Sequence, residues 1–123
     1  MAWTHYSELI VWQKAMDLTD QIYSLTRLLP REELFCLTDQ MRRAAVSIPS
    51  NIAEGHGRHS EKESKHFLSI AQGSVCELDT QLRICLRQGY FPEEQAAAAL
   101  ALCQETGRML TKMITSPPND PKN

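Results

Sequence analysis

Apolar and polar positions follow the period of an amphipathic helix in four successive segments of this chain. The first segment spans residues 7–29, and its apolar positions recur at spacings of three and four. They are Leu9, Trp12, Ala15, Met16, Ile22, Tyr23, Thr26 and Leu29. Pro30 predicts the end of this helix, because the residue before a proline disfavours helical geometry. The start of the second helix stays open between Glu32 and Thr38.

The second segment has a proline in the middle of a helical pattern, in the stretch RAAVSIPSNIAEG at residues 43–55. At about 100° per residue, five apolar positions fall on one side of the helix and keep their phase across Pro49. They are Met41, Ala44, Ala45, Ile48 and Ile52. A chain that broke and restarted would have no reason to keep this register. The pattern therefore predicts one kinked helix from about Thr38 to Glu54, ended by Gly55.

Pro49 has a cost within such a helix. It removes one backbone hydrogen bond and crowds the carbonyl of Ala45, at about 3 kcal/mol. We expect the polar side chains of Ser47, Ser50 and Asn51 to satisfy the backbone groups that it frees.

The third helix is predicted to begin near Glu61, because Ser60-Glu-Lys-Glu63 matches a capping box. Its apolar stripe comprises Phe67, Ile70, Ala71, Ser74, Val75, Leu78, Leu82, Cys85 and Leu86, and Gly89 suits its end. Pro92 and the acids after it favour a fourth helix start. That helix is expected to run through Leu100, Cys103, Gly107, Leu110 and Ile114 and to end before Pro117.

Four helices with short connections predict an all-α protein, an up-down-up-down four-helix bundle with a proline-kinked second helix. We expect residues 1–116 to form this single domain and residues 117–123 to be a disordered tail. The 123 residues, 42% of them hydrophobic and 23% charged, suit one soluble domain with its own core. The amino-terminal residues lack a signal-peptide pattern, and no apolar run is as long as a membrane span. These features predict a cytoplasmic protein.

The net charge of −2 gives no global attraction to nucleic acid or to a membrane. Only the middle of the chain is basic, since residues 42–92 carry seven Lys or Arg against five Asp or Glu. The four cysteines lack metal-ligand spacing and stand among apolar residues, so we expect buried, reduced thiols. They are Cys36, Cys76, Cys85 and Cys103.

Three motifs carry a resemblance to a known family. They are VWQKA at residues 11–15, QMRRAAVSIPSNIAEG at residues 40–55, and FLSIAQGS at residues 67–74 followed by Glu77-Leu and Gln81-Leu. The chain resembles the small four-helix bundle proteins first noticed as reading frames within intervening sequences of bacterial 23S ribosomal RNA genes. The resemblance covers about residues 9–91.

The resemblance implies a bundle fold and closed, ring-like homo-oligomers, commonly pentamers. Related accessory proteins of diversity-generating retroelements look like the same bundle and bind nucleic acid and a reverse transcriptase through a basic surface. The function of the intervening-sequence proteins themselves is largely unassigned. This sequence differs in being mildly acidic.

A polar stripe on the second helix is our candidate subunit interface. Its residues are Arg43, Ser47, Ser50, Asn51 and Glu54. Short side chains allow a second helix to approach closely, whereas a solvated face usually favours long Lys and Glu side chains. We expect Arg43 to pair with a carboxylate such as Glu54, of its own or a neighbouring chain. An ordinary solvated face is the alternative.

The basic residues of the middle segment are the candidates for nucleic-acid contact. They are Arg42, Arg58, Lys62, Lys65, Arg83 and Arg87. A ring would repeat this modest patch and build phosphate affinity by multivalency. Ion pairs with interleaved acids are the alternative. Sequence-specific base recognition is not expected, because Phe67 is interpreted as a core residue and the histidines are the only other aromatic stacking partners in this region.

The sequence indicates no catalytic, cofactor or metal site and no small-molecule substrate. His56, His59 and His66 stand near acids, but without a metal-protease motif or a cysteine partner. Glu63-Ser-Lys-His66 matches a di-iron motif only once. We therefore predict a non-enzymatic binding or scaffolding protein with RNA or a ribonucleoprotein as its leading partner. A scaffold that binds only proteins is the alternative.

Overall fold

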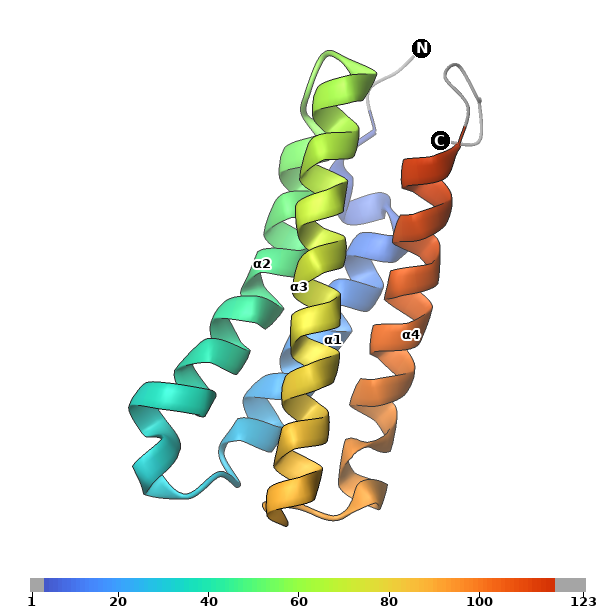
Figure 1. Ribbon diagram of the computed structural model, residues 1–123. Coiled ribbons are helices and arrows are strands. Elements are labelled where there is room, and N and C mark those ends of the chain that lie inside the picture. Colours follow the sequence, from blue (N-terminus) through green and yellow to red (C-terminus); the bar gives the residue numbers. More distant parts are fainter. Residues whose placement is uncertain (1–3, 117–123) are drawn as a thin grey trace.

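The computed structural model describes residues 4–116, which form a bundle of four helices (Figure 1). They are α1 (Ile10–Thr26), α2 (Asp39–His56), α3 (Glu61–Gln88) and α4 (Glu93–Thr115). No strand occurs within these residues. The all-α four-helix bundle expected from the sequence is confirmed. The tail predicted at residues 117–123 lies outside the described residues.

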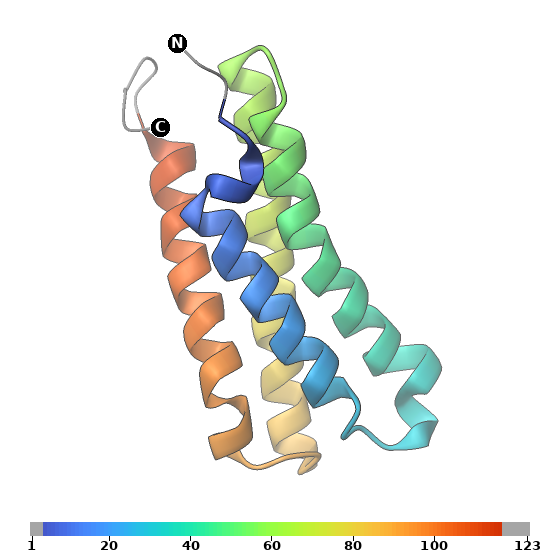
Figure 2. The ribbon, with the colours of Figure 1, turned by 180° about the vertical axis from the view of Figure 1, so that it is seen from behind.

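The helices run alternately up and down, and each packs on two neighbours (Figures 1 and 2). The helix α1 contacts α2 and α4, and α3 contacts the same two helices from the opposite corner of the bundle. Short connections favour this antiparallel arrangement of sequence neighbours. Between residues 4 and 116, the helices lack the combination of length and apolar content that would let one cross a membrane.

Two helix ends form as the sequence predicts. The Ser60 side chain accepts a hydrogen bond from the Glu63 amide at 3.1 Å, which caps α3 at Glu61. Gly89 ends the same helix with φ of 74°, in the left-handed region that glycine adopts without a steric penalty. Helix α4 then begins directly after Pro92.

The connection from α1 to α2 is itself helical. A 3-10 turn (Arg31–Glu33) follows Pro30, a π-helical turn (Leu34–Thr38) follows it, and α2 begins at Asp39. The second helix therefore starts one residue beyond the range that the sequence left open. A shorter 3-10 turn (Tyr6–Glu8) precedes α1.

Helix α2 passes through Pro49 without interruption, as its apolar register predicts. The carbonyl of Ala45, which loses its helical donor to Pro49, has a hydroxyl donor from α1 instead. Thr19 Oγ1 lies 3.2 Å from this oxygen and 2.9 Å from the Ala15 oxygen. The Asn51 side chain does not donate to the Ala45 carbonyl. Its amide donates instead to the Ser47 carbonyl at 2.8 Å, so the expectation that Asn51 would satisfy the freed group was wrong. The freed carbonyl is thus stabilised by the neighbouring helix.

Gly55 does not end α2, contrary to the sequence prediction. The helix continues to His56, and Gly57 caps it through its amide. Gly55 is buried where α2 meets α3. A Cβ atom added there would lie 3.0 Å from the carbonyl oxygen of Ser64 and 3.3 Å from Phe67 Cβ. The glycine therefore permits a close approach of two helices.

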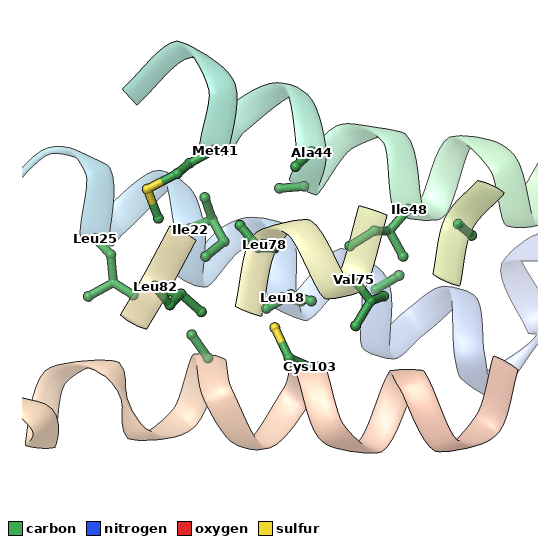
Figure 3. Packing of buried hydrophobic residues seen from close by; sticks show 14 of the residues in the cluster. Leu18, Ile22, Leu25, Met41, Ala44, Ile48, Val75, Leu78, Leu82 and Cys103 are labelled. Atoms are coloured by element: carbon green, nitrogen blue, oxygen red, sulfur yellow. The ribbon is translucent and has the colours of Figure 1, made fainter. Parts of the chain in front are cut away.

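The core is a layered cluster from all four helices (Figure 3). The apolar face predicted for α2 is fully confirmed. In the other helices the buried positions also alternate by three and four, the spacing of knobs-into-holes packing. They are Val11, Ala15, Leu18, Ile22 and Leu25 on α1, Leu68, Ala71, Val75, Leu78, Leu82 and Cys85 on α3, and Ala96, Ala99, Cys103, Thr106 and Leu110 on α4.

Some large apolar residues assigned to the core lie outside it. On α1, Trp12 is half-buried and Met16 is exposed. On α3, Phe67 is half-buried and Ile70 is exposed, while the neighbouring Leu68 takes the core position. The burial predicted for the cysteines holds only for Cys85 and Cys103, because Cys36 and Cys76 are exposed.

Candidate interaction surfaces

An open groove of about 400 Å³ runs between α1 and α2. Its lining is mainly apolar and includes the Pro49 ring: Tyr6, Trp12, Met16, Thr19, Val46, Pro49, Ser50 and Ala53. Met16 is 38% exposed and Val46 43% exposed. The sequence pattern predicted Trp12 and Met16 to lie on the single apolar face of the first helix. They instead form a second apolar stripe on α1, beside its core stripe.

The 3-10 turn before α1 brings Tyr6 to this groove. Its ring lies 5.4 Å from the Trp12 ring between centroids, in a tilted arrangement. Gln13 Nε2 donates to the Ser7 carbonyl at 2.9 Å and fixes the turn on the helix. The groove is therefore built from a packed aromatic pair and two helix faces, and its apolar surface is open to a partner.

A second apolar surface lies at the connection between α1 and α2. Phe35 is 88% exposed there, with Leu34 at 46% and Leu28 at 47%. Phe35 belongs to the π-helical turn. Exposed aromatic side chains are enriched at protein interfaces. No sequence pattern marks this residue, because a lone phenylalanine in a short connection has no periodicity.

The charged residues of the proposed subunit stripe on α2 form ion pairs within the chain. Arg43 pairs with Asp39 at 3.1 Å, and Glu54 pairs with Arg58 at 2.5 Å. The pairing of Arg43 with Glu54 within one chain is therefore not formed. Both observed pairs join exposed residues four apart in sequence, and such an ion pair contributes at most about 0.5 kcal/mol.

The small polar residues of the stripe do not all face outward. Ser74 of α3 donates to Ser47 Oγ at 2.9 Å, and Asn51 Nδ2 lies 3.0 Å from the same atom. These contacts place Ser47 and Asn51 at the seam between α2 and α3. Ser50 is exposed and lines the groove described above. Of this stripe, Ser50 is thus the residue that meets the apolar surface.

The basic side chains do not form one patch. Arg58, Lys62 and Lys65 lie at the end of the bundle where α2 meets α3, whereas Arg83 and Arg87 lie near the other end of α3. The 25 residues from Lys62 to Arg87 correspond to about 38 Å of helix. These residues belong to one basic segment of the sequence, but the length of α3 separates them in space.

Most of these basic groups also have local partners. Arg42 Nε donates to Thr26 Oγ1 at 2.9 Å, with its guanidinium 4.8 Å from the Tyr23 ring centroid. The Arg58 guanidinium lies 4.5 Å from the Phe67 ring centroid. Stacking of this kind stabilises a guanidinium over an aromatic face and leaves Phe67 covered.

Lysine and arginine side chains of α3 are similarly engaged. Lys65 donates to the Ser116 carbonyl at 2.7 Å, at the end of α4. Arg83 donates to Asp79 at 2.7 Å, and this hydrogen bond raises the pKa of Arg83. Within residues 4–116, Lys62 and Arg87 form no ion pair. Of the six candidate residues, these two are the ones that a phosphate could reach without displacing a partner among the contacts described above.

The polar side chains offer little for catalysis. Burial raises the pKa of Cys85 to about 11 and that of Cys103 to about 12, so both thiols stay protonated at neutral pH. Among the described residues, no group of three His, Cys, Asp or Glu is placed to hold a metal ion. His56, His59 and His66 are therefore not brought together as a ligand set.

Comparison with known proteins places the chain in a family. The sequence model of the 23S rRNA-intervening sequence proteins matches residues 7–112. The chain belongs to the 23S rRNA-intervening sequence protein family. The match covers all four helices except the last residues of α4. No curated protein matches the sequence.

A solved structure has the same fold as this member of the 23S rRNA-intervening sequence protein family. It is the crystal structure of a protein with unknown function from the S23 ribosomal protein family of Bacteroides thetaiotaomicron VPI-5482. The two proteins are 25% identical with a TM-score of 0.80, over 87% of this chain and 100% of the other. The resemblance noted in the sequence is thus confirmed at the level of family and fold.

Proposed function

We propose that this protein is a non-enzymatic scaffold that assembles with copies of itself into a closed ring. The observation that carries the proposal is the apolar groove between α1 and α2. It exposes Met16 and Val46 beside Pro49. Apolar surface of this kind is typical of an interface with another protein.

A homo-oligomer is the assembly that this surface suits best. Every copy of the chain carries the same groove, and homo-oligomers commonly have closed symmetry. In the proteins that this chain resembles, such rings are commonly pentamers. Ser50 is the polar residue of the predicted α2 stripe that lines this groove.

The test is the mass of the particle for matched surface variants, measured by sedimentation velocity. Val46→Glu adds a charge within the groove and is expected to shift the particle towards the monomer. Ile84→Glu is the control, because Ile84 is 42% exposed, as Val46 is 43% exposed, but lies on α3. Loss of assembly in both variants, or in neither, would argue against the groove as the interface.

RNA or ribonucleoprotein binding is a second function with support of its own. The family name refers to 23S rRNA intervening sequences, and Arg58, Lys62 and Lys65 cluster at the end of the bundle between α2 and α3. A ring would repeat this cluster in each copy and gain affinity by multivalency. The contacts would be to phosphates, because the nearby aromatic ring of Phe67 is already covered by Arg58.

Fluorescence anisotropy of a structured RNA tests this second function. Binding should be strong at about 50 mM salt and weaker by orders of magnitude at about 200 mM, because phosphate contacts release counterions. An Arg58→Ala/Lys62→Ala variant should lose RNA binding. Arg87→Ala, at the other end of α3, should retain most of the RNA affinity. No binding by an intact oligomer at low salt would leave the protein scaffold as the function.

A further inference from the structure

A small cavity of about 90 Å³ lies at the end of the bundle that carries the connection between α2 and α3 (Figure 1). Four apolar side chains line it, one from the residue before α1 and one from each of the other three helices. They are Leu9, Ile52, Leu68 and Met113. Ile52 and Leu68 are buried, whereas Leu9 and Met113 are half-buried against the core. The floor of the cavity is therefore apolar.

The other side of the cavity is polar and lies nearer to solvent. Its residues are His56, Glu61, Ser64 and Lys65. Glu61 is exposed and the other three are half-buried, so this side is the mouth of the cavity. His56 contacts the Thr4 carbonyl, and Lys65 donates to the Ser116 carbonyl at 2.7 Å. These contacts bring both ends of the described chain to the mouth.

Three polar groups at the mouth keep unused hydrogen-bonding capacity. The Lys65 ammonium and the Glu61 carboxylate lie 3.7 Å apart, which is too long for a good hydrogen bond. An ammonium group has three donors, and the Ser116 carbonyl takes only one of those of Lys65. The Ser64 hydroxyl has no hydrogen-bond partner among residues 4–116. A cation, an anion and a hydroxyl thus face one apolar cavity.

We propose that this cavity binds a free aliphatic α-amino acid of the size of valine or leucine. The α-carboxylate accepts hydrogen bonds from Lys65 and Ser64, and the α-ammonium group donates to Glu61. The branched side chain lies on the apolar floor. An apolar cavity of about 150 Å³ holds benzene, so one of about 90 Å³ holds about three or four carbon atoms. This size fits an isopropyl or isobutyl group and excludes an aromatic ring.

The opposite charges at the mouth favour a zwitterion over a ligand with one charge. A simple carboxylate would be attracted to Lys65 but repelled by Glu61, and a simple amine would meet the reverse. A zwitterion satisfies both groups with charge-assisted hydrogen bonds, which are stronger than neutral ones. A residue within a peptide lacks this pair of adjacent charges, so the ligand is the free amino acid.

The cavity is separate from the surfaces of the proposed function. None of its lining residues belongs to the groove between α1 and α2. Lys65 is also a candidate for RNA contact, but amino-acid binding is measured without RNA. A failure of this inference therefore leaves the assembly and the RNA proposal standing, and their failure leaves this inference standing.

Titration of the full chain with L-valine and L-leucine, followed by two-dimensional amide NMR, tests the site. We expect saturable shifts at residues 52–56, 61–68 and 113, with a dissociation constant in the millimolar range or tighter. Glycine lacks the side chain, valinamide lacks the carboxylate and isovalerate lacks the ammonium group. Each of these should bind at least about tenfold more weakly than L-valine.

Two outcomes of the titration would overturn the inference. One is the absence of saturable shifts at these residues with both amino acids up to their solubility. The other is equal binding of L-valine, valinamide and isovalerate, because a site built for a zwitterion must distinguish them.

Charge-removing variants provide the second test. Glu61→Gln and Lys65→Met should each weaken L-valine binding at least about tenfold. Glu93→Gln is the matched control for the acid, because Glu93 begins α4 as Glu61 begins α3. Lys62→Met is the control for the base, since Lys62 is exposed on α3 outside the cavity. The amide spectrum shows that each variant is folded, and equal affinity in the test and control variants would overturn the assignment.

Discussion

Thr19 on α1 lies within hydrogen-bond distance of the carbonyl that Pro49 leaves without its helical donor, at 3.2 Å from Ala45 O. The Ala15 oxygen, which lies 2.9 Å from the same hydroxyl, already has a helical donor in the Thr19 amide. The second helix therefore keeps its proline because the first helix supplies a replacement donor. Thr19 and Pro49 also both line the groove between α1 and α2.

Thr19→Val should show that this contact stabilises the fold. The change keeps the shape of the side chain but removes the hydroxyl, so the Ala45 carbonyl loses its donor at a cost of about 1 to 2 kcal/mol. Thr19→Ser is the matched control and should retain most of the stability. The measurement is urea unfolding at constant protein concentration.

A double-mutant cycle with Pro49→Ala isolates the mechanism. Alanine restores the helical amide donor to Ala45, so Thr19→Val should then destabilise less, with a coupling of at least about 0.5 kcal/mol. An equal loss in both backgrounds would mean that Thr19 stabilises the fold in another way.

Gly55 should not tolerate alanine, although alanine is the better helix former. The added Cβ would lie 3.0 Å from the Ser64 carbonyl oxygen, a backbone atom that cannot rotate away. We expect a loss of about 1 to 3 kcal/mol in urea unfolding. Gly73→Ala on α3 is the control, since nothing lies within 4 Å of its added Cβ. It should stabilise the protein by about 0.5 to 1 kcal/mol, and a similar response at both sites would contradict the close helix approach.

The sequence could predict the elements whose signals are local. The capping box at Ser60, the left-handed Gly89 and the register of α2 across Pro49 depend on residues near in sequence, and all are confirmed. It could not assign Trp12 and Phe67 correctly, because each stands one position from a core residue, Val11 or Leu68, and only packing decides between them. The donor to Ala45 was missed because it comes from another helix.

The candidate surfaces were harder to predict for the same reason. Charge counting grouped Lys62 with Arg87, but a continuous α3 places them at opposite ends. Small polar side chains indicated a free stripe on α2, yet Ser47 bonds to Ser74 across the seam with α3. The exposure of Phe35 follows from the π-helical turn, which has no sequence signature in a single chain.

The four thiols should fall into different reactivity classes with Ellman's reagent at about pH 8, where only thiolates react. Cys76 is exposed and should react fast, whereas Cys85 and Cys103 should react only on unfolding, because burial raises their pKa values to about 11 and about 12. Cys36 is also exposed and should react fast as well. Fast modification of all four thiols in the folded protein would contradict the packing of α3 and α4.

Tyr90 should make stability depend on pH in the alkaline range. Its hydroxyl donates to Glu33 Oε2 at 2.8 Å, and this bond raises the pKa of Tyr90 to about 12 from 10.0. A raised pKa means that the folded state holds the proton more tightly. The contribution is therefore complete below pH 10.0 and is lost as the pH rises through about 12.

Unfolding of Tyr90→Phe across this range provides the measurement. The variant should be less stable than the wild type at neutral pH, and the two should converge between pH 10.0 and about 12. The thiols titrate in both proteins and cancel in the difference. A constant difference across this range would show that Glu33 does not hold the Tyr90 proton.

The most direct test of the scaffold is the absolute mass of the wild-type particle, measured by light scattering across a dilution series. We expect one discrete multiple of the 14.0 kDa chain, with five copies implied by the resemblance, and a shift towards the monomer for Val46→Glu. A particle of 14.0 kDa at every concentration, identical in the wild type and the variant, would contradict the proposed self-assembly.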